Sequence, residues 1–200
     1  MTPPIYDFDG TTKYEIGKLY DFDGTTTSQI GKVYDNNGTT SSLIYTAQYA
    51  VFDNGNAVDY AGGWTTKSSG NGSSNMTTSI YTYAYNTKNS YRAYITSAKI
   101  PTSQFSKLTV DWQYSGKTYS TWGCARIALS NYNYISWANG YPTGGFVVSA
   151  QSSAGTSRIT TIWDISSYTS DYYFVTVSCS GVDTYEGYKA SSYVYSIILE

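Results

Sequence analysis

The residues best suited to chemistry lie in one stretch, residues 130–145, which mixes aromatic rings with asparagine amides and glycines. Sugars present flat C–H faces and many hydroxyls, so rings can cover the faces while amides bond the hydroxyls. The alternative is an ordered loop whose rings pack back onto its own domain. The stretch predicts a glycan-binding loop, with candidate ligand contacts at Tyr132, Tyr134, Trp137, Asn139 and Tyr141.

A second candidate loop, residues 180–190, combines charged and aromatic side chains. Such a mixture at a connection between strands is typical of either a binding loop or a solvated hairpin end. We predict that its ligand contacts are Asp183, Tyr185 and Tyr188.

The sequence offers little for catalysis or for a cofactor. It has no histidine, which excludes the Ser/His/Asp triad, the Cys/His dyad and ordinary zinc sites. Glycosidases use paired carboxylates, but beyond residue 45 the only close acidic pair in a loop is Asp183 with Glu186. The segment Asp7-Phe8-Asp9-Gly10 lacks the further oxygens of a calcium loop. We therefore expect no enzymatic activity, no cofactor and no metal.

Composition excludes further classes of partner. Charged residues make up 13% of the chain and the net charge is −2, so no basic patch is present to neutralise nucleic-acid phosphates. No apolar run approaches the length of about 20 residues that crosses a bilayer. The N-terminus lacks the pattern of a signal peptide, so we expect synthesis in the cytoplasm without secretion by that route.

The 24 tyrosines, with many Thr, Ser, Asn and Gly residues, are typical of an all-β extracellular or virion protein. Residues 45–200 alternate in strand fashion and show no helical apolar stripe. We predict a two-sheet sandwich, a jelly roll, in this domain. Its expected strands are residues 45–52, 79–85, 91–98, 108–114, 125–129, 146–149, 158–163, 172–179 and 193–199.

Strand alternation also predicts where some side chains point. Val175 and Val177 define the expected core phase of their strand, and Cys179 shares it. Cys124 is instead in phase with Arg126, so two separate thiols are favoured over a disulfide. A row of three tyrosines on one strand face is expected to pack between sheets or against another subunit, with a ligand platform as the alternative: Tyr81, Tyr83 and Tyr85.

The first 44 residues repeat a short phrase three times, with Tyr6, Tyr20 and Tyr34 at intervals of 14 residues. Asp9-Gly10 and its equivalents are typical of tight hairpin turns. Hairpins this short are marginal alone in water, so we expect neighbouring copies to complete them. Residues 1–44 are predicted to form a β-repeat stalk that makes a homotrimer; a flexible linker is the alternative.

The repeat at residues 20–35 resembles repeats in tail and tail-fibre proteins of phages and prophages of gut Firmicutes. Gly62-Gly63-Trp64 and the terminal segment 193–200 match two further landmarks of those chains. The resemblance implies a virion protein of the distal tail, assembled with other virion proteins and binding a host-surface glycan. The alternative is a capsid or tail decoration protein whose role is to bind subunits.

Overall fold

The computed structural model describes residues 6–8, 13–15, 20–22, 25, 27–29, 32–36, 41–46, 48–55, 62–69, 72–85, 91–117, 123–138, 141–143, 145–152, 157–180 and 189–200. The chain divides into two compact units, Met1–Tyr49 with Glu200 and Ala50–Leu199. Each unit is described by itself.

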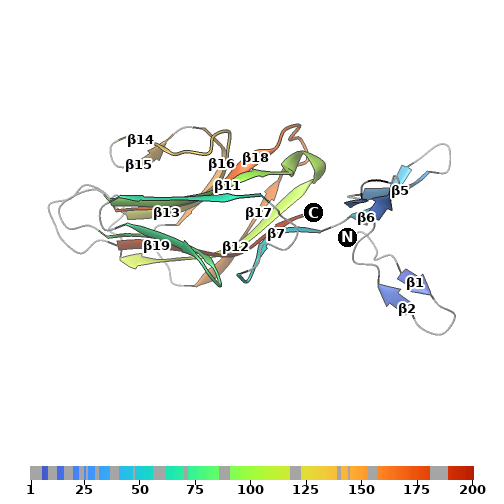
Figure 1. Ribbon diagram of the computed structural model, residues 1–200, viewed down its shortest axis with the longest axis horizontal. Helices are drawn as coiled ribbons and strands as arrows, with labels where there is room; N and C mark the ends of the chain where they lie inside the picture. The colour runs from blue at the N-terminus through green and yellow to red at the C-terminus, as the bar shows by residue number, and fades with distance from the viewer. Residues whose placement is uncertain are drawn as a thin grey trace. The chain divides into compact units, whose positions relative to one another are not determined.

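The first unit contains three antiparallel hairpins, shown in blue in Figure 1. Two of them repeat the same register: Tyr6 pairs with Glu15 in the first and Tyr20 with Gln29 in the second. The sequence repeat is therefore a repeat of hairpins, while the stalk and its trimer stay predictions. The hairpins are β1 (Tyr6–Phe8) with β2 (Lys13–Glu15), β3 (Tyr20–Phe22) with β4 (Thr27–Gln29), and β5 (Lys32–Asn36) with β6 (Ser41–Thr46).

The second unit is a β-sandwich of two antiparallel sheets (Figure 1), which confirms the all-β prediction. One sheet has the order β17 (Arg158–Asp164), β12 (Lys107–Lys117), β19 (Lys189–Leu199), β10 (Ile80–Tyr85) and β9 (Ser73–Met76), and β7 (Tyr49–Asp53) also pairs with β19. The other has the order β16 (Phe146–Ser152), β13 (Gly123–Ser130), β18 (Tyr172–Ser180), β11 (Tyr91–Ile100) and β8 (Trp64–Ser69). We call them the six-stranded and the five-stranded sheet.

The apolar core lies between the sheets. On β12, Leu108, Val110, Trp112 and Tyr114 are buried at every second position, as a half-buried strand requires. The indole Nε1 of Trp112 donates a hydrogen bond of 2.9 Å to Oγ1 of Thr161, so this large ring is buried without losing its polar group.

Hydroxyl groups bridge the two sheets inside the sandwich. Thr82 Oγ1 and Ser178 Oγ lie 2.7 Å apart, and Thr176 Oγ1 donates to Ser192 Oγ at 2.9 Å. All four residues are fully buried. On β18, Thr176 and Ser178 therefore point into the sandwich, and alternation sends the valines on either side of Thr176 to the outer side.

The predicted orientation of β18 is thus wrong, and so is the prediction of separate thiols. Cys179 is disulfide-bonded. The chain's only other cysteine, Cys124, is its direct neighbour across the β13–β18 pair. Cys179 follows the outer phase of β18, which it shares with Val177, and the backbone of Cys124 lies directly opposite it. Directly opposed residues of an antiparallel pair are close enough for a disulfide.

A short 3-10 helix, Thr102–Gln104, follows Pro101. No helix in the described part of the chain is long and apolar enough to cross a membrane.

Candidate functional site

The first predicted binding loop leaves the five-stranded sheet after β13 and returns to it at β16. Along the way β14 (Ser136–Ala138) and β15 (Tyr141–Thr143) form a small hairpin. Figure 1 shows this hairpin on the outer side of the five-stranded sheet. The loop therefore lies across a sheet face and does not extend freely from the end of the sandwich.

Hydrogen bonds to the sheet hold the loop in place. The Asn131 amide donates to the Gly145 carbonyl at 2.8 Å, and the Tyr132 amide donates to Ser130 Oγ at 3.1 Å. A longer contact of 3.4 Å joins Thr96 Oγ1 to the Asn133 carbonyl. The backbone of the loop is consequently held at Asn131 and Gly145, where it leaves and rejoins the sheet, and at Asn133.

The loop also covers a phenol of the sheet. Burial raises the pKa of Tyr94, and a hydrogen bond with the Ile135 backbone partly offsets that rise. Ile135 itself is buried. The Ile135 side chain thus anchors the loop inward, while Tyr132 and Tyr134 remain at the surface.

Gly145 is required where the loop closes. Its φ of +75° lies in the left-handed region, and a Cβ there would lie 2.6 Å from Cδ2 of Tyr132. The ring of Tyr132 therefore packs directly against the glycine backbone, which restricts how that ring can move.

Tyr132 and Tyr134, which we call the tyrosine pair, are 49% and 51% exposed. Their ring centroids lie 5.1 Å apart and their planes differ by 26°, an offset stack. Asn131 and Asn133, which alternate with them, are exposed as well. The two rings are therefore about half exposed, although the Tyr132 ring also contacts Gly145. The pair offers aromatic surface beside amide groups, the combination that suits a sugar.

The described residues of the loop carry no ionisable acid or base other than phenols. A neutral ligand therefore meets no electrostatic penalty there. Among the described residues, no group of three or more His, Cys, Asp or Glu side chains is placed to hold a metal ion.

The other predicted contacts are not placed at this site. Backbone pairing sets Trp137 opposite Pro142 and Tyr141 opposite Ala138, but the side chains of Trp137 and Tyr141 are not described. Asn139 and residues 181–188 of the second candidate loop, with Asp183, Tyr185 and Tyr188, lie outside the described residues.

Sequence reasoning gave too little weight to another group of aromatic residues. The row on β10 does not lie between the sheets. Ile80, Thr82 and Ala84 are fully buried, so the tyrosines between and after them face outward. The signal was present as strict alternation along β10, but the sequence did not show which phase faces the core.

No family model matches the chain, and no curated protein matches it. Two solved structures show similarity. One is the glycoside hydrolase domain Spr0440, Endo-D, from Streptococcus pneumoniae R6, at 13% identity and a TM-score of 0.39, covering 68% of this chain and 21% of that chain. The other is infectious bursal disease virus, Gt strain, at 9% identity and a TM-score of 0.29, covering 89% of this chain and 38% of that chain. This chain thus spans well under half the length of either structure.

The first of these similarities contradicts the prediction that the chain is not an enzyme, because a domain of an enzyme is among the structures that it resembles. The sequence argument had considered only histidine-based motifs and close pairs of acids. At 13% identity the similarity does not establish an enzymatic activity for this chain.

Proposed function

We propose that this chain is a surface-attachment protein that binds neutral glycans through the tyrosine pair. The observation that carries the proposal is the exposed, stacked arrangement of these two rings on a loop tied to the sheet. Because the backbone of residues 131–133 is already tied to the sheet, a ligand need not restrict that segment on binding, and less affinity is lost to ordering.

Within this proposal the chain is a distal-tail virion protein of the kind that the repeats resemble. Its sandwich is a jelly roll, and its repeats form a trimeric stalk. Three copies would present three weak sites together, and linked weak sites gain strongly from multivalency. The disulfide at Cys179 supports the proposal that the protein acts outside a reducing cytosol, because disulfides persist in oxidising surroundings.

The test is a glycan array and a binding assay on host cells with the wild-type chain and with Tyr132→Ala/Tyr134→Ala. Loss of two stacking rings should weaken binding by about tenfold or more, since each tenfold is worth about 1.4 kcal/mol. Tyr132→Phe/Tyr134→Phe retains both rings and serves as the matched control. Binding to no glycan, or full binding by the alanine variant, would contradict the proposal.

A second candidate function, decoration of a capsid or tail through subunit contacts, is favoured by a different observation. Ile159 and Ile162 are 41% and 61% exposed on β17, which is an edge strand, and Val147 is exposed on β16, the nearest strand in sequence and also an edge. An exposed edge strand with apolar side chains is a template on which another chain can pair. Stoichiometric binding to purified particles, lost in Ile162→Asp and unaffected in Tyr132→Ala/Tyr134→Ala, would favour this role.

A further inference from the structure

The outer face of the six-stranded sheet carries a second and larger group of tyrosines, away from the loop just described. Tyr81 is directly opposite Tyr193 in the β10–β19 pair, and Tyr83 is opposite Ser191. None of these rings belongs to the core, because the residues alternating with them on β10 are fully buried. We call this group the tyrosine face; its members are Tyr81, Tyr83, Tyr85, Tyr193 and Tyr195.

The rings on β10 form an evenly spaced ladder. The centroids of Tyr81 and Tyr83 lie 6.4 Å apart, and those of Tyr83 and Tyr85 lie 6.5 Å apart. Their planes differ by only 12° and 6°. Tyr193 extends the ladder sideways, with its centroid 4.8 Å from that of Tyr81. A repeating ladder suits a ligand that itself repeats along its length.

One end of the ladder opens into a hollow of about 390 Å³, within the range of about 300–1,000 Å³ for small-molecule sites. Three tyrosines line it, Tyr81, Tyr193 and Tyr195, and the rest of its wall consists of short polar residues between positions 75 and 79. No charged residue lines the hollow. Its wall therefore supplies rings, hydroxyls and one amide, that of Asn75.

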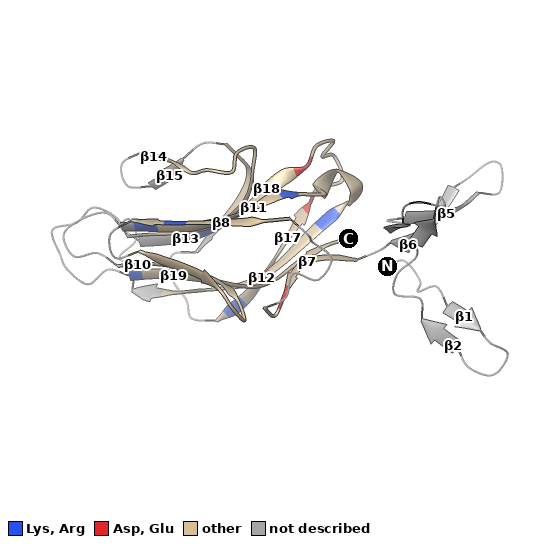
Figure 2. Ribbon diagram, viewed as in Figure 1, with Lys and Arg blue, Asp and Glu red and all other residues tan. Residues whose placement is uncertain are grey.

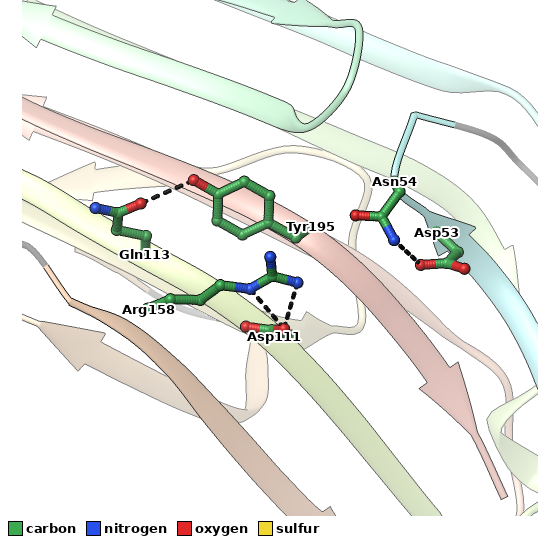
Figure 3. Close-up of polar contacts among 6 residues, drawn as sticks. All are labelled: Asp53, Asn54, Asp111, Gln113, Arg158 and Tyr195. Carbon is green, nitrogen blue, oxygen red and sulfur yellow. Dashed lines mark hydrogen bonds and ion pairs between the residues drawn. The ribbon is translucent and has the colours of Figure 1, made fainter.

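A network of polar contacts fixes the ring at the far side of the hollow, as Figure 3 shows. The Tyr195 hydroxyl donates to Gln113 Oε1 at 2.8 Å. The Arg158 guanidinium lies over the Tyr195 ring, 4.2 Å from its centroid, and its Nε donates to Asp111 Oδ2 at 2.6 Å. The ring is thus held in one orientation before any ligand arrives, which lowers the entropic cost of binding.

The charges of this face are confined to its ends. Arg158 and Asp111 form an ion pair beyond Tyr195, and the negative charge of Asp53 also acts on Arg158 there. At the opposite end Lys189 is opposite Tyr85. Figure 2 shows how sparse charged residues are along the described strands. Burial raises the pKa of Tyr81 and of Tyr83, as do neighbouring phenols, so both remain neutral donors at physiological pH.

The character of this face favours a glycan over a second protein. Its five tyrosines are all partly exposed. None of them is among the large apolar side chains that are strongly exposed in the described part of the chain. The fully buried centre of a protein interface is more apolar than the rest of a protein surface, whereas hydroxyl and amide groups line the hollow beside its rings. A sugar instead needs ring surface with hydroxyl and amide groups beside it, and Thr77, Thr78 and Asn75 are exposed next to Tyr81.

We propose that the tyrosine face binds an extended neutral glycan, whose sugars lie along the β10 ladder and whose end enters the hollow at Tyr81. This site is separate from the tyrosine pair, which belongs to the other sheet. It does not depend on the pair being a binding site, although both would recognise the same chemical class.

The test is calorimetric titration with defined probes. These are hexamers of neutral sugars (cello-, manno- and chito-oligosaccharides), the matching disaccharides, and an oligogalacturonate hexamer as the charged control. We expect at least one neutral hexamer to bind the wild-type chain, with the disaccharide and the charged hexamer binding more weakly.

The decisive variant is Tyr81→Ala/Tyr83→Ala, in which hexamer affinity should fall by about tenfold or more. Tyr81→Phe/Tyr83→Phe retains the rings and should retain most of the affinity. Tyr132→Ala/Tyr134→Ala should still bind the hexamer at the face, which separates failure of this site from failure of the tyrosine pair. If the double alanine variant does not fold, Asn75→Ala on the exposed rim replaces it, and it should also lose affinity.

Three outcomes would overturn the proposal: no neutral hexamer binds, the face variants bind as tightly as the wild type, or Tyr81→Ala/Tyr83→Ala lowers the mass in light scattering. The last outcome would assign the tyrosine face to contacts between copies of the chain.

Discussion

The outer faces of the two sheets differ in how far their side chains are buried. On the five-stranded sheet, Val175 and Val177 point outward yet are buried, and the loop between β13 and β16 lies on that side. On the six-stranded sheet, the outward residues of β10 are partly exposed tyrosines beside an uncharged hollow. The outward valines of β18 are thus buried, whereas the outward tyrosines of β10 remain partly exposed among the described residues.

This difference teaches that alternation along a strand identifies two phases but does not tell which phase faces the sandwich. On β18 the hydroxyl-bearing phase, Thr176 and Ser178, faces inward and is satisfied by hydroxyls of the opposite sheet. The aliphatic phase faces outward under a loop. Burial of both phases is possible only where a further segment covers the outer face.

The largest effect on the free energy of unfolding should come from removing the disulfide, which belongs to the five-stranded sheet. Cys124→Ser/Cys179→Ser opens a loop of roughly 55 residues, which should lower the free energy of unfolding by about 4 kcal/mol in the chain-entropy model. Denaturant unfolding of the variant checks this, with the wild type unfolded in reducing buffer as the control. Equal midpoints for oxidised and reduced wild-type chains would contradict the disulfide's structural role.

The next largest loss of stability should come from breaking the hydrogen bond between Thr176 and Ser192, which joins the two sheets. Thr176→Val removes the donor that satisfies Ser192 in the interior, and an unsatisfied buried hydroxyl costs about 1–3 kcal/mol. Adding Ser192→Ala should restore part of that loss, because both polar groups are then gone. A double variant less stable than the sum of the single variants would show that the pair does not act as a bridge.

Gly145 tests how firmly the covering loop holds the tyrosine pair. Gly145→Ala forces a Cβ into the left-handed region, at about 1–2 kcal/mol, and against the Tyr132 ring. We expect lower stability together with weaker glycan binding at the pair, and unchanged binding at the tyrosine face. The same loss of affinity at both surfaces would mean that the two faces are not independent.

The smallest effect concerns the contribution of the tyrosine face to stability at high pH. The pKa of Tyr81 and of Tyr83 lies above the ordinary value of 10.0, mainly because of burial. The folded chain therefore retains these protons while the unfolded chain loses them. Their contribution to stability is present below pH 10 and declines as the pH rises through the folded pKa values. Tyr81→Phe/Tyr83→Phe should flatten this alkaline decline, and an unchanged slope would argue against it.

Most of the sandwich could be predicted from the sequence. Each of the nine expected strands overlaps a strand of the structure, because aromatic and branched residues alternate along them. The strands β8 and β9 were missed. They consist mostly of Ser, Thr, Asn and Lys, which carry no apolar phase, and the structure places them at sheet edges.

The candidate site could be predicted only in composition. The rings of Tyr132 and Tyr134 were evident from their setting of asparagines. The contacts that hold them involve Thr96, Ser130 and the conformation of Gly145, and only the fold brings these residues together. For Tyr81, Tyr83 and Tyr85 the sequence left a ligand platform only as the alternative, because whether β10 turns its tyrosines inward or outward depends on partners in another strand.

The most direct test of the account is amide chemical-shift mapping of the wild-type chain titrated with the neutral glycan hexamer that binds best. The account predicts shifts at residues 131–135 and along β10 and β19, with β18 beneath the covering loop unaffected. Shifts confined to β18 and β11, or no shifts with any neutral hexamer, would contradict it.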